Sequence, residues 1–136
     1  MAGNILLEVV TPDRAVVSEE VQIVVAPGLV GEFGVLPGHT PFLASLKPGV
    51  LRYKGSGGEE RIFVSSGFAE TLPNKVTVLV DAAERKVDID VARAKAAMER
   101  AQKRLAGQAA EKETIDAARA RAALERAFYR LRLAQS

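Results

Sequence analysis

The character of the sequence changes at about residue 87. Before this point, short runs rich in Val and Ile alternate with Gly, Pro, Asn and Asp; after it, proline is absent and Gly107 is the only glycine. The first pattern is typical of short strands joined by turns. The second, rich in Ala, Arg, Glu, Lys and Leu, is typical of helices. The sequence therefore predicts two domains, a β domain over residues 1–86 and a helical domain over residues 87–136.

The β domain is expected to contain several short strands at regular spacing. Lys54 to Glu60 (KGSGGEE) and Leu72 to Lys75 (LPNK) carry the signals of hairpin loops. Regularly spaced strands of this kind favour a small antiparallel β-sandwich or barrel. The runs that predict the strands are ILLEVVTPD, AVVSEEVQIVVAPG, VLRYKGSGGEE, RIFVSSGFAETLPN and KVTVLVDAA.

The helical domain is expected to be an antiparallel hairpin. Asp90 is a suitable N-cap for a helix that runs to about Ala106, and Thr114 for a second that runs to about Leu133, with GQAAEKE as the turn. Alanine-rich seams let two helices approach closely but bury little area, so docked and extended hairpins are both reasonable. The predicted seams are Val91, Ala94, Met98, Ala101 and Leu105, and Ala117, Ala120, Leu124, Ala127 and Leu131.

Composition limits the chemistry of the chain. Cys is absent and His39 is the only histidine, so thiol catalysis and the usual zinc sites are excluded, and we expect neither catalytic residues nor metal ligands. No segment approaches the roughly 20 apolar residues of a membrane span, and the N-terminus lacks the basic region of a signal peptide. Any membrane association should therefore come through a partner.

The formal net charge of +2 is unevenly distributed. Residues 1–84 carry 6 Lys and Arg against 10 Asp and Glu, a net −4, whereas residues 85–136 carry 13 against 7, a net +6. This division indicates that the two domains have different partners.

Three arginines form a stripe on the first predicted helix. At about 100° per residue, Arg93, Arg100 and Arg104 fall within about 40° of one another, and Asp90 lies one turn before Arg93. Such a stripe is either a site that holds phosphates bidentately or a solvated face with ion pairs, and spacing alone leaves both open. On the second helix, Arg126 and Arg130 are predicted to lie largely opposite a seam of Leu124, Phe128 and Leu131.

The segment from Gly31 to Pro41, GEFGVLPGHTP, is dense in glycine and proline. It lacks the Lys and the Ser or Thr of a phosphate-binding loop. His39 has no acidic or nucleophilic neighbour in a recognisable arrangement, which favours a turn or interface residue over a general base. Glu32 is expected in a loop, either as a contact site or as an ordinary exposed turn residue.

In its order of motifs the chain resembles the epsilon subunits of F-type ATP synthases. The resemblance rests on GEFGVLPGHTPFLASLKPGVLR, VTVLVDAAER and IDVARAKAAMERAQKRL, and it covers essentially the whole chain. It implies a non-catalytic rotor subunit of the central stalk, with a β-sandwich bound to the gamma subunit and to the c ring. By this resemblance GEFGVLPGHTP is a rigid docking loop, Glu32 lies near the polar loops of the c ring, and the region of His39 faces gamma.

The resemblance also implies a regulatory ligand. Some members of this family bind ATP on the hairpin, and by resemblance Glu84, Arg126 and Arg130 join that site. ATP would then favour a folded hairpin over an extended one that reaches the catalytic alpha and beta subunits and blocks hydrolysis; no obligatory cofactor is implied. The chain fits the ATP-binding pattern of the family at Ile89, Asp90, Arg93, Ala94, Ala97, Arg100, Ala101, Arg104 and Leu105.

The sequence supports two other classes of function less well. The basic hairpin could bind nucleic acid, but acidic residues are interspersed among the basic ones and aromatic residues for base stacking are few. The sequence contains no recognisable catalytic motif, which argues against a free-standing enzyme. The expected location is the cytoplasmic face of a bacterial plasma membrane, in a proton-translocating synthase, with no nucleic-acid partner.

Overall fold

The strands of the N-terminal unit follow the Val- and Ile-rich runs. The computed structural model describes residues 3–108 and 114–136, without the side chains of residues 108 and 114–116. The chain divides into two compact units, Met1–Lys86 and Val87–Ser136. The first contains β1 (Ile5–Val10), β2 (Ala15–Val21), β3 (Ile23–Gly28), β4 (Gly31–Val35), β5 (Phe42–Leu46), β6 (Gly49–Gly55), β7 (Gly58–Val64), β8 (Gly67–Leu72), β9 (Lys75–Val80) and β10 (Ala83–Arg85).

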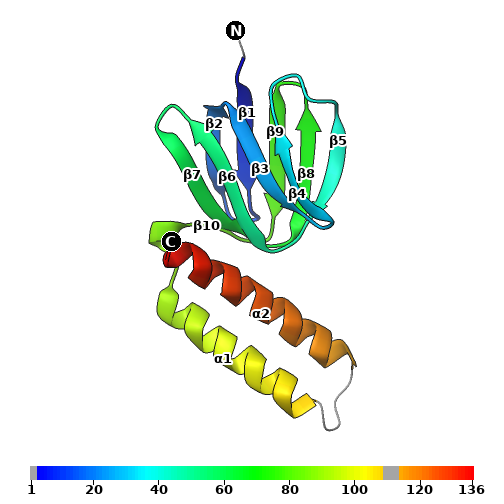
Figure 1. Cartoon of the computed structure of the whole chain (residues 1–136), viewed down its shortest axis with the longest axis vertical. Helices are drawn as coiled ribbons and strands as arrows, with labels where there is room; N and C mark the ends of the chain where they lie inside the picture. Colours follow the sequence, from blue (N-terminus) through cyan, green and yellow to red (C-terminus); the bar gives the residue numbers. More distant parts are fainter. Residues whose placement is uncertain (1–2, 109–113) are drawn as a thin grey trace. The chain divides into compact units, whose positions relative to one another are not determined.

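All ten strands belong to one sheet that wraps into a sandwich (Figure 1). The order along the sheet is β10-β7-β6-β3-β5-β8-β9-β1-β2, and β4 pairs with β3 beside this path. The predicted antiparallel β-sandwich is confirmed, with one exception to the antiparallel arrangement, because β1 and β9 pair in parallel. These two strands lie far apart in the sequence, so a parallel pairing between them needs no tight turn.

The core of the β unit lies between the inward faces of the strands. Burial alternates along β1, where Ile5, Leu7 and Val9 are fully buried and the residues between them are partly exposed. On β9, Val76 and Val78 are fully buried in the same way. This period of two is what a strand with one face on a core produces. The outward residues are consequently free to form a second, different surface.

Two of the predicted hairpin loops are confirmed and prove to be tight. β6 and β7 pair up to Gly55 and Gly58, and β8 and β9 pair up to Leu72 and Lys75. Gly58 has a φ of 103°, a conformation that glycine adopts without steric cost. Most of KGSGGEE is therefore strand, and only its two central residues form the turn.

The helical unit is an antiparallel hairpin, as predicted (Figure 1). A short 3-10 turn, η1 (Lys86–Asp88), leads into α1 (Val91–Gln108), and α2 (Thr114–Ala134) follows. Both helices extend one or two residues beyond their predicted C-terminal ends. Most of the predicted turn, residues 109–113, and the side chain of the predicted N-cap Thr114 lie outside the described residues. Within the described residues, neither helix is long and apolar enough to cross a membrane.

Candidate functional site

The first helix of the hairpin begins with a side-chain cap. Asp90 Oδ1 accepts a hydrogen bond from the backbone N–H of Arg93 at 3.0 Å, and the Asp90 carbonyl accepts one from Ala94 at 3.0 Å. The predicted N-cap is therefore confirmed. Ile89, just before the cap, is 8% exposed. Together these contacts fix the first turn of α1 and hence the position of Arg93.

The two helices meet along small residues. Ala94 and Ala101 of α1 are 4% and 3% exposed, and Ala120 and Ala127 of α2 are each 1% exposed. Ala97 is half-buried beside this line. Most of the predicted seam is thus correct, because alanine side chains are small enough for close helix packing.

Two predicted seam residues are not part of the contact. Val91 is 38% exposed and Phe128 is 42% exposed. Val91 is the first residue of α1 and is rotated by about 60° from Ala94. Phe128 lies about 100° from Ala127 on the helix, which rotates its ring away from the contact line. The predicted seam positions of Val91 and Phe128 are therefore wrong.

The arginines of α1 lie together on one flank of this contact line. Arg93, Arg100 and Arg104 are exposed and are rotated by about 80° to 120° from Ala94, all in the same sense. None of the three takes part in a salt bridge within the part of the chain that the structure describes. Within the described residues the stripe is therefore solvated and carries no salt bridge, and the phosphate site stays a prediction.

The arginines of α2 fall on the same side of the hairpin. Arg119, Arg126 and Arg130 are rotated by about 60° to 100° from Ala127, in the same sense as the α1 arginines from Ala94. In an antiparallel pair of helices, residues rotated in the same sense from the contact line face the same side of the pair. The structure therefore gathers six guanidiniums, three from each helix, on one side, which we call the arginine face. Its members are Arg93, Arg100, Arg104, Arg119, Arg126 and Arg130.

The prediction that Arg126 and Arg130 lie opposite the seam is wrong. Both side chains are half-buried, and they flank Ala127. The error came from including Phe128 in the seam, because this displaced the centre of the apolar stripe away from its true position. Both arginines therefore lie on the same side of the hairpin as Arg93 and Arg100.

Glu84, the remaining candidate of this group, belongs to the other unit. It lies on β10 opposite Phe63 of β7 and is half-buried. The other candidates for the ATP site all belong to the helical unit: Ile89, Asp90, Arg93, Ala94, Ala97, Arg100, Arg126 and Arg130.

The segment GEFGVLPGHTP is a strand for half of its length. Gly31 to Val35 form β4, which pairs antiparallel with β3 so that Glu32 lies opposite Pro27. Glu32 is therefore in a strand, and its expected loop position is wrong, because the turn of this hairpin lies earlier, at Leu29 and Val30. Arg52 Nη2 donates to Glu32 Oε1 at 3.4 Å, and both side chains remain substantially exposed.

The second half of the segment is a loop built around aromatic contacts. The His39 ring lies 5.0 Å from the Phe42 ring, and Phe42 packs edge-on against Phe33 at 5.3 Å. His39 Nδ1 lies 2.8 Å from the Thr40 carbonyl oxygen, an acceptor, so the proton of this hydrogen bond belongs to Nδ1. Gly38, with a φ of 84°, allows the turn. The loop is thus held by these aromatic contacts and by a hydrogen bond of 2.7 Å that the Gly38 N–H donates to the Pro73 carbonyl.

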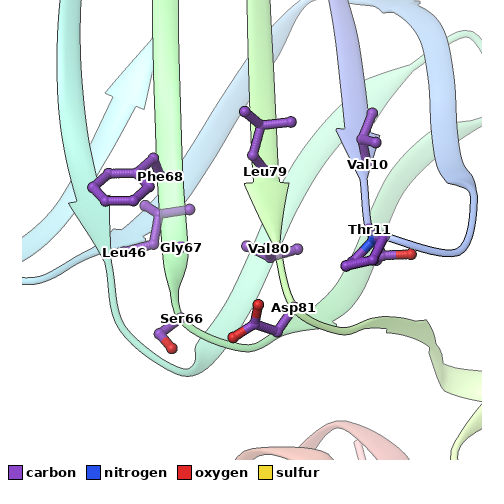
Figure 2. Close-up of a pocket in the computed structure, with 10 residues that line it drawn as sticks. Val10, Thr11, Leu46, Ser66, Gly67, Phe68, Leu79, Val80 and Asp81 are labelled. Atoms are coloured by element: carbon purple, nitrogen blue, oxygen red, sulfur yellow. The ribbon is translucent and has the colours of Figure 1, made fainter.

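An apolar row crosses the outer face of the sheet, and the sequence did not predict it. Phe68 on β8 is 52% exposed, Leu79 on β9 is 51% exposed, and Val10 on β1 is partly exposed. The register aligns Phe68 with Leu79 and Leu79 with Val10, so the three side chains lie side by side, as Figure 2 shows. Leu43 on β5, 70% exposed, adds to the same outer face. Each strand supplies one such residue, so only the register reveals the row.

A pocket of about 600 Å³ lies at the end of this row. Phe68, Leu79 and Val10 form its apolar wall, while Ser66 and Asp81 bring polar groups to its rim (Figure 2). An exposed apolar surface with a polar rim is typical of a protein interaction site. The β unit therefore carries a candidate docking surface that differs in chemistry from the arginine face.

Comparison with known families matches both units of the chain. Residues 4–86 match the family described as "ATP synthase, Delta/Epsilon chain, beta-sandwich domain". Residues 88–135 match the family described as "ATP synthase, Delta/Epsilon chain, long alpha-helix domain". The boundary between the two matches falls in η1.

Individual relatives carry the same description. The chain is 64% identical over 106 residues to the "ATP synthase epsilon chain" of Desulfosudis oleivorans, covering 77% of this chain and 80% of that protein. It is 66% identical over 106 residues to the "ATP synthase epsilon chain" of Desulfatibacillum aliphaticivorans, covering 77% and 75%. A chain of the Euglena gracilis mitochondrial ATP synthase, in a structure of OSCP, F1 and c-ring, matches with a TM-score of 0.81 over 100% of this chain and 84% of that one. At 24% identity this last similarity concerns the fold alone.

Proposed function

The chain belongs to the delta/epsilon family of ATP synthase, and on this premise we propose that it couples the gamma subunit to the c ring and regulates ATP hydrolysis through its helical hairpin. As an epsilon-type subunit of the central stalk it is non-catalytic, and it is peripheral to the membrane through its complex. ATP is proposed as the regulatory ligand of the hairpin. We further propose a proton-driven synthase at the cytoplasmic face of a bacterial plasma membrane, because the two relatives at 64% and 66% identity, from Desulfosudis oleivorans and Desulfatibacillum aliphaticivorans, are bacterial.

The outer face of the β unit supports a protein partner. Phe68, Leu79 and Leu43 are large apolar side chains that are more than half exposed, and a pocket adjoins them. Burial of apolar area at about 25 cal/mol per Å² is the main source of affinity for such a surface. We propose the gamma subunit as the partner that covers it, with His39 on the adjoining loop as a further contact.

The turn between β3 and β4 supports a second contact. Leu29 is 63% exposed and Val30 is fully exposed at its tip, and Glu32 follows on β4. The carboxylate of Glu32 could contact polar loops of a membrane rotor. The two apolar side chains at the tip of the hairpin could contact its apolar edges. We propose this tip as the contact with the c ring.

The arginine face supports the nucleotide. Arg93, Arg100, Arg126 and Arg130 lie on one side of the hairpin, and the α1 members form no salt bridge among the described residues. Guanidiniums bind phosphate oxygens bidentately, so four of them can hold the triphosphate of ATP. Arginines drawn from both helices can be bridged only while the hairpin is closed. ATP bound there would therefore favour the folded hairpin over an extended one that contacts the catalytic subunits.

The observation that carries the regulatory proposal is the one-sided placement of these arginines. It is tested by calorimetric titration of the full chain with ATP, using the variants Arg93→Ala, Arg100→Ala and Arg126→Ala. We expect each to weaken binding by about tenfold, the loss of one charged hydrogen-bonding partner. Arg121→Ala, on the other side of α2, is the matched control and should bind normally. Absence of ATP binding by the wild-type chain would contradict the regulatory ligand and leave the stalk role intact.

The inhibitory role is tested in the reconstituted synthase. Deletion of residues 88–136 should raise ATP hydrolysis, because no hairpin remains to contact the catalytic subunits. Unchanged hydrolysis would overturn this part of the proposal. The docking surface is tested separately by Phe68→Glu and Leu79→Glu, which should abolish gamma binding without loss of stability, since both side chains are exposed.

A further inference from the structure

The arginine face is longer than a single triphosphate. Arg93 and Arg104 are separated along the axis of α1 by about 16 Å, at about 1.5 Å per residue. The three phosphates of a nucleotide span only part of this length, and the base and ribose need no row of cations. Arg119, and Arg104 although it fits the family's ATP-binding pattern, are not among the four arginines proposed above to hold the triphosphate. Their place on the face therefore needs a separate explanation.

The six arginines separate into two groups along the hairpin. In an antiparallel pair, residues equally distant from the facing helix ends, Gln108 of α1 and Thr114 of α2, lie level with one another. By this criterion Arg126 lies slightly closer than Arg93 to the facing helix ends, and Arg130 lies slightly farther from them. We call the group of Arg93, Arg126 and Arg130 the basal triad.

The second group lies nearer to the turn. Arg119 lies level with Lys103, between the levels of Arg100 and Arg104. All three arginines of this distal triad, Arg100, Arg104 and Arg119, are exposed, and within the described residues none of them forms an ion pair. The centres of the two triads are about 13 Å apart along the axis. Each triad combines arginines of both helices.

The surroundings of the arginine face argue against a protein partner on it. Among the described side chains of α1 and α2, the exposed large apolar ones are Val91 and Phe128. Both are rotated away from the contact line in the opposite sense, toward the other side of the hairpin. A protein segment gains much of its affinity from such residues. A single-stranded nucleic acid would need aromatic rings for stacking. Of the described aromatic residues of the hairpin, Phe128 faces the other side, and Tyr129, rotated by about 160° from Ala127, points away from the contact line. The described residues of the face place guanidiniums at regular spacing, with the Asp90 carboxylate at the end of the row beside Arg93, and this spacing suits a linear chain of phosphates.

We propose that the basal and distal triads together form one track for linear inorganic polyphosphate. The inference extends the proposed nucleotide site, because the basal triad and Arg100 are shared with it, whereas Arg104 and Arg119 are specific to the longer ligand. Each phosphate of the chain carries negative charge, so successive phosphates meet guanidiniums along the whole length. Binding should weaken steeply as salt is raised, as for other linear polyanions that release counterions.

The test is calorimetric titration of the full chain with long-chain polyphosphate and with tripolyphosphate. Long-chain polyphosphate should bind more tightly than tripolyphosphate. Arg104→Ala and Arg119→Ala should each weaken long-chain binding by about tenfold and leave tripolyphosphate binding unchanged. Arg121→Ala removes the same charge from the other side of α2 and should change neither. Far-UV circular dichroism of each variant establishes that the hairpin is still helical.

Three results would overturn the track. The first is equal affinity for long-chain polyphosphate and tripolyphosphate. The second is a loss of binding in Arg121→Ala as large as in Arg104→Ala, which would indicate net charge alone. The third is equally tight binding of polyglutamate of matched charge. Titration of ATP into the same proteins tests the nucleotide proposal independently of the polyphosphate track. Polyphosphate binding without ATP binding refutes the nucleotide proposal alone, and ATP binding without any gain from the longer chain refutes the track alone.

Discussion

Arg85 on β10 donates a hydrogen bond from Nη1 to the Tyr53 hydroxyl at 3.2 Å, and Nη2 donates to the Val16 carbonyl at 3.3 Å. These partners lie on β6 and β2, and β2 and β10 are the opposite ends of the strand order. One side chain thus joins both ends of the sheet. Because β10 has only three residues and pairs with β7 alone, Arg85 fixes the last strand before the chain enters η1.

Removal of this side chain should destabilise the β unit. Arg85→Ala leaves the Tyr53 hydroxyl, in a residue that is 1% exposed, without its donor, at a cost of about 1–3 kcal/mol in the free energy of unfolding. The double variant with Tyr53→Phe should recover part of this loss, since no unpaired hydroxyl remains. Urea unfolding measures the three free energies, and strict additivity of the two substitutions would contradict the coupling. Arg61→Ala, which breaks an exposed pair with Glu59, is the control and should cost little.

The same tyrosine should make stability fall at alkaline pH. Burial raises the pKa of the Tyr53 phenol above its ordinary value, although the hydrogen bond from Arg85 acts in the opposite direction. Above about pH 10 the unfolded chain releases this proton while the folded chain keeps it. The contribution is therefore fully present below pH 10 and is lost as the pH rises from there through the folded pKa. Unfolding free energies between about pH 9 and pH 11 should fall more steeply in the wild type than in Tyr53→Phe, and parallel curves would refute this.

Local signals in the sequence predicted the elements well. The change of composition near residue 87 separated strands from helices, and Asp90 marked the start of α1 because an N-cap is a contact with residues three positions away. Short-range chemistry of this kind can be read from a single chain. The ends of the tight hairpins were predicted for the same reason.

Properties that depend on pairing between distant strands were not predicted. Glu32 was expected in a loop because Gly31 and Gly34 look like turn residues, but pairing with β3 makes the segment a strand. The apolar row of Phe68, Leu79 and Val10 depends on the register of three strands, and no local pattern encodes it. On α2, one misassigned aromatic residue reversed the predicted side of two arginines.

A buried hydroxyl in the β unit can be removed with a gain in stability. Thr71 on β8 is fully buried, and its Oγ1 has no hydrogen-bond partner among the described residues. An unpaired buried hydroxyl costs about 1–3 kcal/mol, so Thr71→Val should raise the free energy of unfolding by about 1 kcal/mol. Thr77→Val, at a partly exposed position on β9, should change it by less than about 0.5 kcal/mol. Thermal unfolding of both variants is the measurement, and a lower Tm for Thr71→Val would show that the hydroxyl is bonded.

Gly67 should not tolerate a side chain, because β8 and β9 approach closely there. A Cβ at this position would overlap the Leu79 carbonyl oxygen and lie 2.8 Å from Val80 Cα, so backbone would have to move. We expect Gly67→Ala to cost about 3 kcal/mol. It should also weaken gamma binding, because Gly67 lines the same pocket as Phe68 and Leu79. Gly57→Ala, with no atom within 4 Å of its Cβ, is the control and should be close to neutral, and equal losses in the two variants would contradict the steric argument.

Asp90 should contribute to the hairpin through its cap rather than only through its charge. Asp90→Ala removes the acceptor of the Arg93 N–H and should destabilise α1 by about 1 kcal/mol. Asp90→Asn keeps an acceptor of similar quality and should retain most of the stability. Thermal unfolding of the helical signal distinguishes the two, and an equal loss in both variants would show that the carboxylate charge matters more than the hydrogen bond. Since the cap fixes the turn that carries Arg93, ATP binding should follow the same order, with Asp90→Ala weaker than Asp90→Asn.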